Sequence, residues 1–212
     1  MKNLSNVTCI TTVYKTPDLM KTAYESLRIF YPTIEFLVVD NSEGDECTKY
    51  LDSLMKKDCN LNVIKPKVNI GHGDGMHLGL ENIKTKFAFI FDSDVIFRNG
   101  EFIERMLYLM EENTYGVGWL IELDQIGRDV DITYKGDTVT YLYPAFCLIN
   151  KNQYFSFHKF TKYGLPPLEA MKELKAQRLD KKMLKSFPIR EYLKHLSGAT
   201  RGRYGSCEMI VK

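Results

Sequence analysis

The sequence lacks long hydrophobic runs: none approaches the roughly 20 apolar residues needed to span a bilayer. Residues 1–6 also lack the apolar core of a secretory signal peptide. The formal net charge is only +2 and the lysines are spread along the chain, so neither a nucleic-acid partner nor a membrane surface is indicated. We therefore expect a cytoplasmic protein with no transmembrane segment.

Cysteine is scarce and has no metal-binding pattern. The chain has five cysteines, an odd number, and no two of them have CxxC spacing. Cys9 and Cys147 lie in apolar runs, which favours free buried thiols over disulfides or a zinc site. With 212 residues, of which 44% are hydrophobic, the chain is long enough to bury the core of one domain without such cross-links.

Two common phosphate-binding motifs are absent. The glycine-rich stretch 69–80 contains Gly-x-Gly but not the Gly-x-Gly-x-x-Gly order of dinucleotide-binding proteins, and the chain has no Gly-Lys-Ser/Thr. This pattern argues against a Rossmann dehydrogenase. Glycines ahead of a helix still allow a ligand to approach the backbone closely, although simple loop geometry also explains them.

Strand and helix patterns alternate through the first hundred residues. Continuous or β-branched apolar runs predict strands over residues 7–14, 34–39, 61–64 and 87–91. Helical patterns lie between these runs and end near residues 30, 55 and 84. The alternation predicts an α/β fold with a largely parallel sheet and helices on both faces.

The second half of the chain is less regular. A helix is predicted over residues 100–112, strands over 116–123 and 138–149, and a further helix over 168–179. No repeat and no clear linker divides the sequence, so we expect residues 1–212 to form a single domain.

Two carboxylates follow the apolar run 87–91. Alternation along an extended chain would point Asp92 and Asp94 the same way. Parallel sheets bind ligands beyond the carboxyl ends of their strands, and two carboxylates there suit Mg²⁺ or Mn²⁺ shared with a substrate's phosphates. Alternatively, Asp-Ser-Asp only turns the chain or caps the next helix.

Other polar residues have two interpretations each. Asp40 ends the second strand and could accept a hydrogen bond from a base or ribose, or could form an Asx-turn. Tyr14 could stack on a base or pack with its hydroxyl at the surface. Late in the chain, His195 could complete a metal site and Arg201 could hold phosphates, or both are structural or solvated residues.

Four blocks of sequence together resemble the glycosyltransferases of family 2, which have the GT-A fold. They resemble that family's first strand, its VVDNxS block, its NxG…NxGL block and its metal-binding DxD, in residues 10–14, 36–42, 69–80 and 89–94. Their order and spacing agree over roughly the first 100 residues. The resemblance implies one Rossmann-like GT-A domain, with a nucleotide-sugar-binding half over residues 1–100 and an irregular acceptor-binding half over 101–212.

The resemblance also implies roles for the matching residues. The divalent cation, Mn²⁺ or Mg²⁺, would be bound by Asp94, Asp92 and the late histidine His195. The donor would be a nucleotide-diphosphate sugar, with UDP favoured and GDP or TDP as alternatives. It would contact Thr12, Tyr14, Asp40, Asn69, Gly71, His77, Asp92, Ser93 and Arg201. His77 departs from the family, which usually has Asn at that position.

The catalytic base is where the family pattern does not match. No Glu-Asp pair stands ahead of the predicted late helix, where residues 163–169 read Tyr-Gly-Leu-Pro-Pro-Leu-Glu. Glu169 and Asp137 are the candidate bases, with Asp129 and Asp131 as rivals. In this role a carboxylate would take the proton of the acceptor hydroxyl as that hydroxyl attacks the anomeric carbon.

The activity implied is metal-dependent transfer of a hexosyl or deoxyhexosyl group to a hydroxyl of a glycan or glycoconjugate acceptor, with inversion. Aromatic residues of the second half either stack on sugars or belong to the core: Tyr141, Tyr143, Phe146, Tyr154 and Phe157. The missing Glu-Asp pair supports an alternative, a catalytically inactive glycan- or nucleotide-binding module on the same fold. A sugar-phosphate nucleotidyltransferase fits less well, because residues 12–18 contain no glycine.

Overall fold

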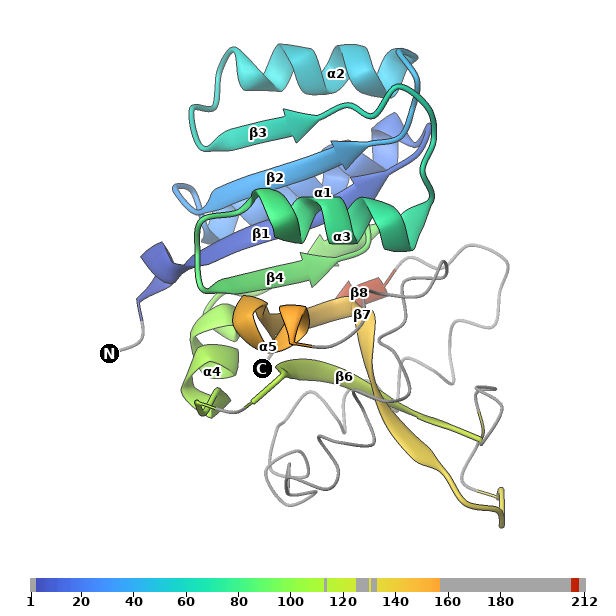
Figure 1. The fold of residues 1–212 in the computed structure, drawn as a ribbon. Helices are drawn as coiled ribbons and strands as arrows, with labels where there is room; N and C mark the ends of the chain where they lie inside the picture. The colour runs from blue at the N-terminus through green and yellow to red at the C-terminus, as the bar shows by residue number, and fades with distance from the viewer. Residues whose placement is uncertain (1–2, 113, 125–129, 131–132, 157–206, 210–212) are drawn as a thin grey trace.

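The computed structural model describes residues 3–112, 114–124, 130, 133–156 and 207–209. Most of its strands form one sheet in the order β3-β2-β1-β4-β7-β6 (Figure 1). These strands are β1 Val7–Val13, β2 Glu35–Asp40, β3 Leu61–Ile64, β4 Phe87–Phe91, β6 Gly116–Leu123 and β7 Val139–Asn150. Two short strands, β5 Val95–Phe97 and β8 Cys207–Met209, pair separately. The helices are a 3-10 turn, η1 Leu4–Asn6, and α1 Pro17–Phe30, α2 Glu46–Met55, α3 His72–Asn82, α4 Phe102–Leu109 and α5 Lys151–Phe155.

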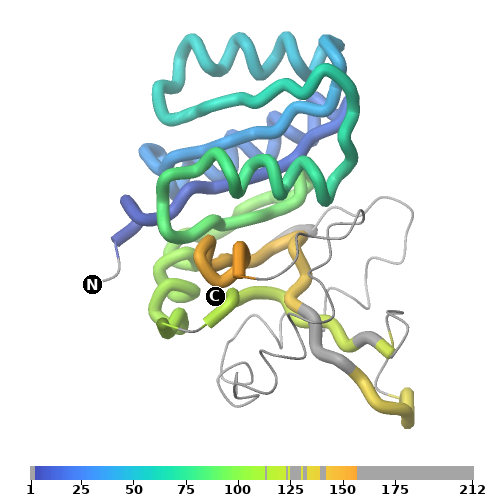
Figure 2. Tube along the Cα trace, in the orientation of Figure 1, coloured from blue at the N-terminus to red at the C-terminus, as the bar shows by residue number. Residues whose placement is uncertain are grey.

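The sheet is mostly parallel. β1 pairs in parallel with β2 and β4, and β2 pairs in parallel with β3. β7 runs antiparallel to both of its neighbours, β4 and β6. Residues 146–150 of β7 pair with β4, and residues 147–149 also pair with β6 on the other side. Residues 139–142 pair with β6 but not with β4, so β6 and β7 continue together past β4 (Figure 2). The predicted α/β class and mostly parallel sheet are confirmed.

Each face of the sheet has its own buried core. On β4, Phe87, Phe89 and Phe91 share a core with α1, α2 and α4, while Ala88 and Ile90 share a core with α3 and α5. This division follows from the alternation of side chains along an extended strand. The helices therefore cover both faces of the sheet, as the alternating pattern predicts. Every second side chain at the end of a strand points toward the face that α3 covers.

Glycines allow α3 to lie close against β1. A Cβ atom on Gly75 would stand 2.6 Å from Thr12 Cγ2, and one on Gly79 would stand 2.7 Å from Ile10 Cγ2. Both separations are shorter than van der Waals contact, so only glycine fits without a shift of the neighbouring strand. The helix starts at His72, inside the glycine-rich stretch 69–80, because these glycines serve helix–strand packing.

The other elements of the first half begin and end within about three residues of their predicted bounds. β5, β8 and α5 were not predicted, because segments of three to five residues have too little periodicity. The helix predicted over 168–179 lies outside the described residues. Within the described parts of the chain, no helix is both long and apolar enough to cross a bilayer. Cys9 and Cys147 are free and buried, as predicted.

We expect Gly79→Ala to lower the free energy of unfolding by about 1–3 kcal/mol, because the new methyl group overpacks the contact with the stiff, β-branched Ile10. Urea denaturation measures the change. Glu81→Ala, at an exposed position of the same helix, is the matched control and should shift it by no more than about 0.5 kcal/mol. If Gly79→Ala is as stable as the control, the close approach of α3 to β1 is not a constraint.

Candidate functional site

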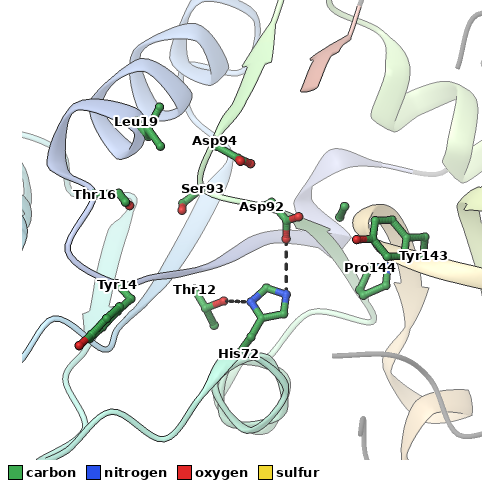
Figure 3. Close-up of a pocket in the computed structure, with 11 residues that line it drawn as sticks. Thr12, Tyr14, Thr16, Leu19, His72, Asp92, Ser93, Asp94, Tyr143 and Pro144 are labelled. Atoms are coloured by element: carbon green, nitrogen blue, oxygen red, sulfur yellow. Dashed lines mark hydrogen bonds and ion pairs between the residues drawn. The ribbon is translucent and has the colours of Figure 1, made fainter. Parts of the chain in front are cut away.

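A cavity of about 400 Å³ opens at the carboxyl ends of β1 and β4, the edge at which parallel α/β sheets bind ligands (Figure 3). It is lined by residues from the ends of β1 and β4, the starts of α1 and α3, and β7: Thr12, Tyr14, Thr16, Leu19, His72, Asp92, Ser93, Asp94, Tyr143, Pro144 and Ala145. The structure thus brings together five of the predicted donor- and metal-binding residues: Thr12, Tyr14, Asp92, Ser93 and Asp94.

A turn after β4 delivers both carboxylates to this cavity. The Asp92 amide donates to the Ala145 carbonyl of β7 at 3.1 Å, and the Val95 amide donates to the Asp92 carbonyl at 3.2 Å. The strand ends at Phe91, so the expected alternation does not continue to Asp94. Asp92 instead points toward α3. Asp94 lies two residues later in the turn, and both carboxylates line the same cavity (Figure 3).

The two carboxylates are poorly compensated. Burial raises the pKa of Asp92 from its ordinary value of 3.8 to about 6. Burial, followed by the negative charge of Asp92, also raises the pKa of Asp94. Asp92 Oδ1 is buried and has no hydrogen-bond partner among the described residues. Among all of the residues that the structure describes, no three His, Cys, Asp or Glu side chains are arranged to hold a metal. The pair therefore offers oxygen ligands and negative charge to a cation, but not a complete coordination shell.

His72 is a site residue that sequence reasoning missed. Its Nδ1 atom lies 2.7 Å from Thr12 Oγ1, and its Nε2 atom lies 3.4 Å from Asp92 Oδ1. Burial lowers the pKa of the imidazole, although the nearby charge of Asp94 opposes this shift. The only available signal is a polar residue directly after Gly71 within the glycine-rich block, and no spacing marks it as chemical.

Aromatic side chains border the cavity on two sides. The Tyr14 residue is 47% exposed, which leaves its ring accessible for stacking. Across the cavity, Tyr143 packs edge-on against Trp119, with ring centroids 5.1 Å apart. Of the other aromatic candidates, Phe146 and Tyr154 are buried in the core. The Tyr141 side chain and Phe157 lie outside what the structure describes.

Asp40 ends β2 close to the cavity, but its carboxylate is already hydrogen-bonded within the fold. Oδ1 accepts from the Ser42 amide at 2.9 Å, and Oδ2 accepts from the Thr48 hydroxyl at 2.5 Å. The residue is 1% exposed and does not line the cavity. The Asx-turn that the sequence allowed is therefore present, and contact with a base stays a prediction.

Three other predicted donor residues do not line the cavity. Asn69 Oδ1 accepts from the Gly71 amide at 2.8 Å, and Gly71 has a φ of +87° directly before α3. His77 lies on α3, with Nδ1 2.8 Å from the Tyr154 hydroxyl and Nε2 3.5 Å from Glu81 Oε1.

Among the candidate bases, only Asp137 belongs to the described residues, and it does not line the cavity. It is exposed, between β6 and β7. Glu169, Asp129, Asp131, His195 and Arg201 lie outside the described residues. Their predicted roles therefore stay predictions.

Several solved structures share this architecture, and one of them is a mannosyltransferase. The mannosyltransferase PcManGT of Pyrobaculum calidifontis, in complex with GDP-Man and Mn²⁺, matches with a TM-score of 0.61 and 12% identity over 78% of this chain and 50% of that one. GalNAc-T7 with UDP, GalNAc and Mn²⁺ matches with a TM-score of 0.60 and 11% identity over 76% and 38%. TarS 1–349 of S. aureus in complex with UDP matches with a TM-score of 0.53 and 20% identity over 74% and 50%. The chain thus spans half or less of the length of these proteins.

These likenesses, with the sheet order and the position of the cavity, define the GT-A glycosyltransferase fold. The model of glycosyl transferase family 2 matches residues 8–161, and the chain belongs to this family. Comparison with curated protein sequences finds no match.

We expect Asp92→Asn to raise the free energy of unfolding at about pH 7.5 by about 1 kcal/mol. This value is reduced because the side chain is partly exposed and solvent screens its charge. The raised pKa means that the folded state binds the proton more tightly than the unfolded chain, so stability falls as pH rises from about 4 to about 6. Asparagine removes this loss. Urea denaturation at about pH 7.5 and pH 4 measures the gain, which should nearly vanish at the lower pH.

The control for this pH dependence is Glu35→Gln, at an exposed position at the start of β2. It should change the free energy of unfolding by less than about 0.5 kcal/mol at both pH values. A destabilised Asp92→Asn protein at neutral pH would contradict the uncompensated burial of this carboxylate.

Proposed function

We propose that the chain is a metal-dependent glycosyltransferase that moves a sugar from a nucleotide-diphosphate sugar to a hydroxyl of a glycan or glycoconjugate, with inversion. The observation that carries the proposal is the Asp92–Asp94 pair, which faces one cavity at the carboxyl edge of the sheet. Family membership and the fold support the same reaction class.

The residues at the cavity suit a divalent cation. Two carboxylates with raised pKa values lie together, and one oxygen of Asp92 is buried without a hydrogen bond. Oxygen ligands of this kind favour Mn²⁺ or Mg²⁺, and PcManGT and GalNAc-T7 were solved with Mn²⁺. Asp92 and Asp94 would hold the cation, with His195 as the predicted further ligand. When bound, the cation would neutralise charge that develops on the leaving diphosphate.

The donor would lie between the end of β1 and the turn after β4. Tyr14, Thr12 and Ser93 all line the cavity. Tyr14 would stack on the base, and the Thr12 and Ser93 hydroxyls would contact the rest of the donor. UDP is the favoured nucleotide, because TarS and GalNAc-T7 were solved with UDP; GDP and TDP are the alternatives, and PcManGT was solved with GDP-Man. Asp40 would contact the base, and its carboxylate also holds the turn after β2 by accepting from Ser42 and Thr48.

The acceptor would approach from the β7 side of the cavity, where Tyr143 and Pro144 belong to the second half of the chain. Residues 1–100 would then bind the donor, and residues 101–212 would shape the acceptor site. Apart from Asp92 and Asp94, no described carboxylate lines the cavity. That observation favours the second candidate, a catalytically inactive glycan- or nucleotide-binding module, unless Glu169 or Asp137 reaches the acceptor.

Thermal unfolding with UDP, GDP, TDP and CMP, each with and without Mn²⁺, tests the donor site. We expect one nucleoside diphosphate to raise the midpoint only when Mn²⁺ is present, because a ligand bound to the folded state stabilises it by mass action. Asp94→Asn should abolish this increase. Asp52→Asn, at an exposed carboxylate on α2, should retain it. Equal shifts with and without Mn²⁺ would contradict metal dependence.

Cleavage of the matching nucleotide sugar separates the enzyme from the binding module. We expect slow, Mn²⁺-dependent hydrolysis in the absence of an acceptor, and a rate at least about 100-fold lower in Asp94→Asn, because charge on the leaving diphosphate is then not neutralised. Chromatography of the released nucleotide measures the rate, with Asp52→Asn as the control. Tight metal-dependent nucleotide binding without cleavage would indicate the inactive module.

A further inference from the structure

His72 links the end of β1 to the carboxylate that follows β4. The imidazole lines the cavity, with one nitrogen 2.7 Å from Thr12 Oγ1 and the other 3.4 Å from Asp92 Oδ1 (Figure 3). The family resemblance assigns no role to this position. Asp92 Oδ1 has no hydrogen-bond partner among the described residues, and the imidazole lies within ion-pair distance of it.

The chemistry of the three side chains indicates which group donates in the contact between Thr12 and His72 and in the contact between His72 and Asp92. An ionised carboxylate can only accept, so the proton of a neutral imidazole belongs on Nε2, facing Asp92. Nδ1 is then an acceptor, and the Thr12 hydroxyl donates to it. The separation of 3.4 Å between Nε2 and Oδ1 is longer than a full hydrogen bond, so a small rotation of either side chain is needed to complete it.

The surrounding backbone holds His72 in this place. Gly71 has a φ of +87°, which starts α3 at His72, and the Gly71 carbonyl accepts from Asn41 Nδ2 at 3.1 Å. One turn later, Gly75 lies so close to Thr12 that a Cβ atom would stand 2.6 Å from its methyl group. The start of the helix is therefore fixed against the end of β1, which places the ring between Thr12 and Asp92.

We propose that His72 is a positioning residue, which orients the Asp92 carboxylate for the divalent cation and is itself held by Thr12. This inference rests on the proposed function, because it concerns the same cation. Partners that orient a metal-binding side chain typically change metal affinity by 10- to 100-fold when they are removed. The contact is long, so we expect a change of about tenfold, at the lower end of that range.

Two substitutions of His72 distinguish the loss of its orienting contact with Asp92 from a change in side-chain shape. His72→Leu keeps an apolar side chain of moderate size but removes both nitrogen contacts, whereas His72→Gln keeps an N–H donor that can reach Asp92. We expect the Kd for Mn²⁺, measured by calorimetric titration in the presence of the nucleotide that binds, to rise about tenfold in His72→Leu. His72→Gln should stay within about threefold of the wild type. Thermal midpoints without Mn²⁺ verify that both variants are folded.

A double-mutant cycle tests the role of Thr12. Thr12→Val removes the hydroxyl but keeps the methyl group that packs on α3, so it should weaken Mn²⁺ binding in the wild-type background and have no further effect in His72→Leu. Additive losses would show that Thr12 acts independently of His72, and would overturn that part of the proposal.

The control substitution is Thr22→Val, which removes an exposed hydroxyl of α1 that is not among the residues lining the cavity and should leave Mn²⁺ affinity unchanged. If the wild type binds Mn²⁺ and His72→Leu binds it equally well, the role of His72 is overturned while the proposed function stands. If the folded wild type binds no divalent cation with any nucleotide, both fail.

Discussion

The buried turn Asp40–Ser42 fastens three loops to one another at the carboxyl edge of the sheet. The Ser42 hydroxyl accepts from the Lys15 amide at 2.9 Å, and Asn41 Nδ2 donates to the Gly71 carbonyl. All three side chains of the turn are buried, so a lost partner would leave a polar group unpaired at a cost of about 1–3 kcal/mol. The loop that carries Tyr14 and the start of α3 at His72 both depend on this turn, and so does the shape of the cavity between them.

Much of the fold follows from patterns within short segments of sequence. Continuous apolar runs such as Phe87–Phe91 are buried on both faces, and only a strand between two layers of helices accommodates them. The start of α3 could not be predicted in this way, because glycine disfavours helices in isolation. Packing against Ile10 and Thr12 outweighs that preference here, and it is visible only once the strand and the helix are placed together.

In the candidate site, too, some residues could be predicted from short segments of sequence and others could not. Asp92 and Asp94 could be identified because a carboxylate pair at a strand end has chemical meaning from residue type and spacing alone. His72 could not, because its partners Thr12 and Asp92 are distant in sequence. For Asp40 the sequence allowed both a ligand contact and an Asx-turn; the structure shows its carboxylate accepting from Ser42 and Thr48, and contact with a base stays a prediction.

The pairing of β7 with β4 has a consequence for how the chain folds. Until residues 146–150 are available, β4 is the edge of the parallel half of the sheet, and its five residues are all apolar. An uncovered edge of that kind is prone to pair with another chain. During synthesis this edge emerges well before its partner, so the growing polypeptide passes through an aggregation-prone stage. β7, whose Ala145 carbonyl accepts from the Asp92 amide, ends this aggregation-prone stage when it pairs with β4.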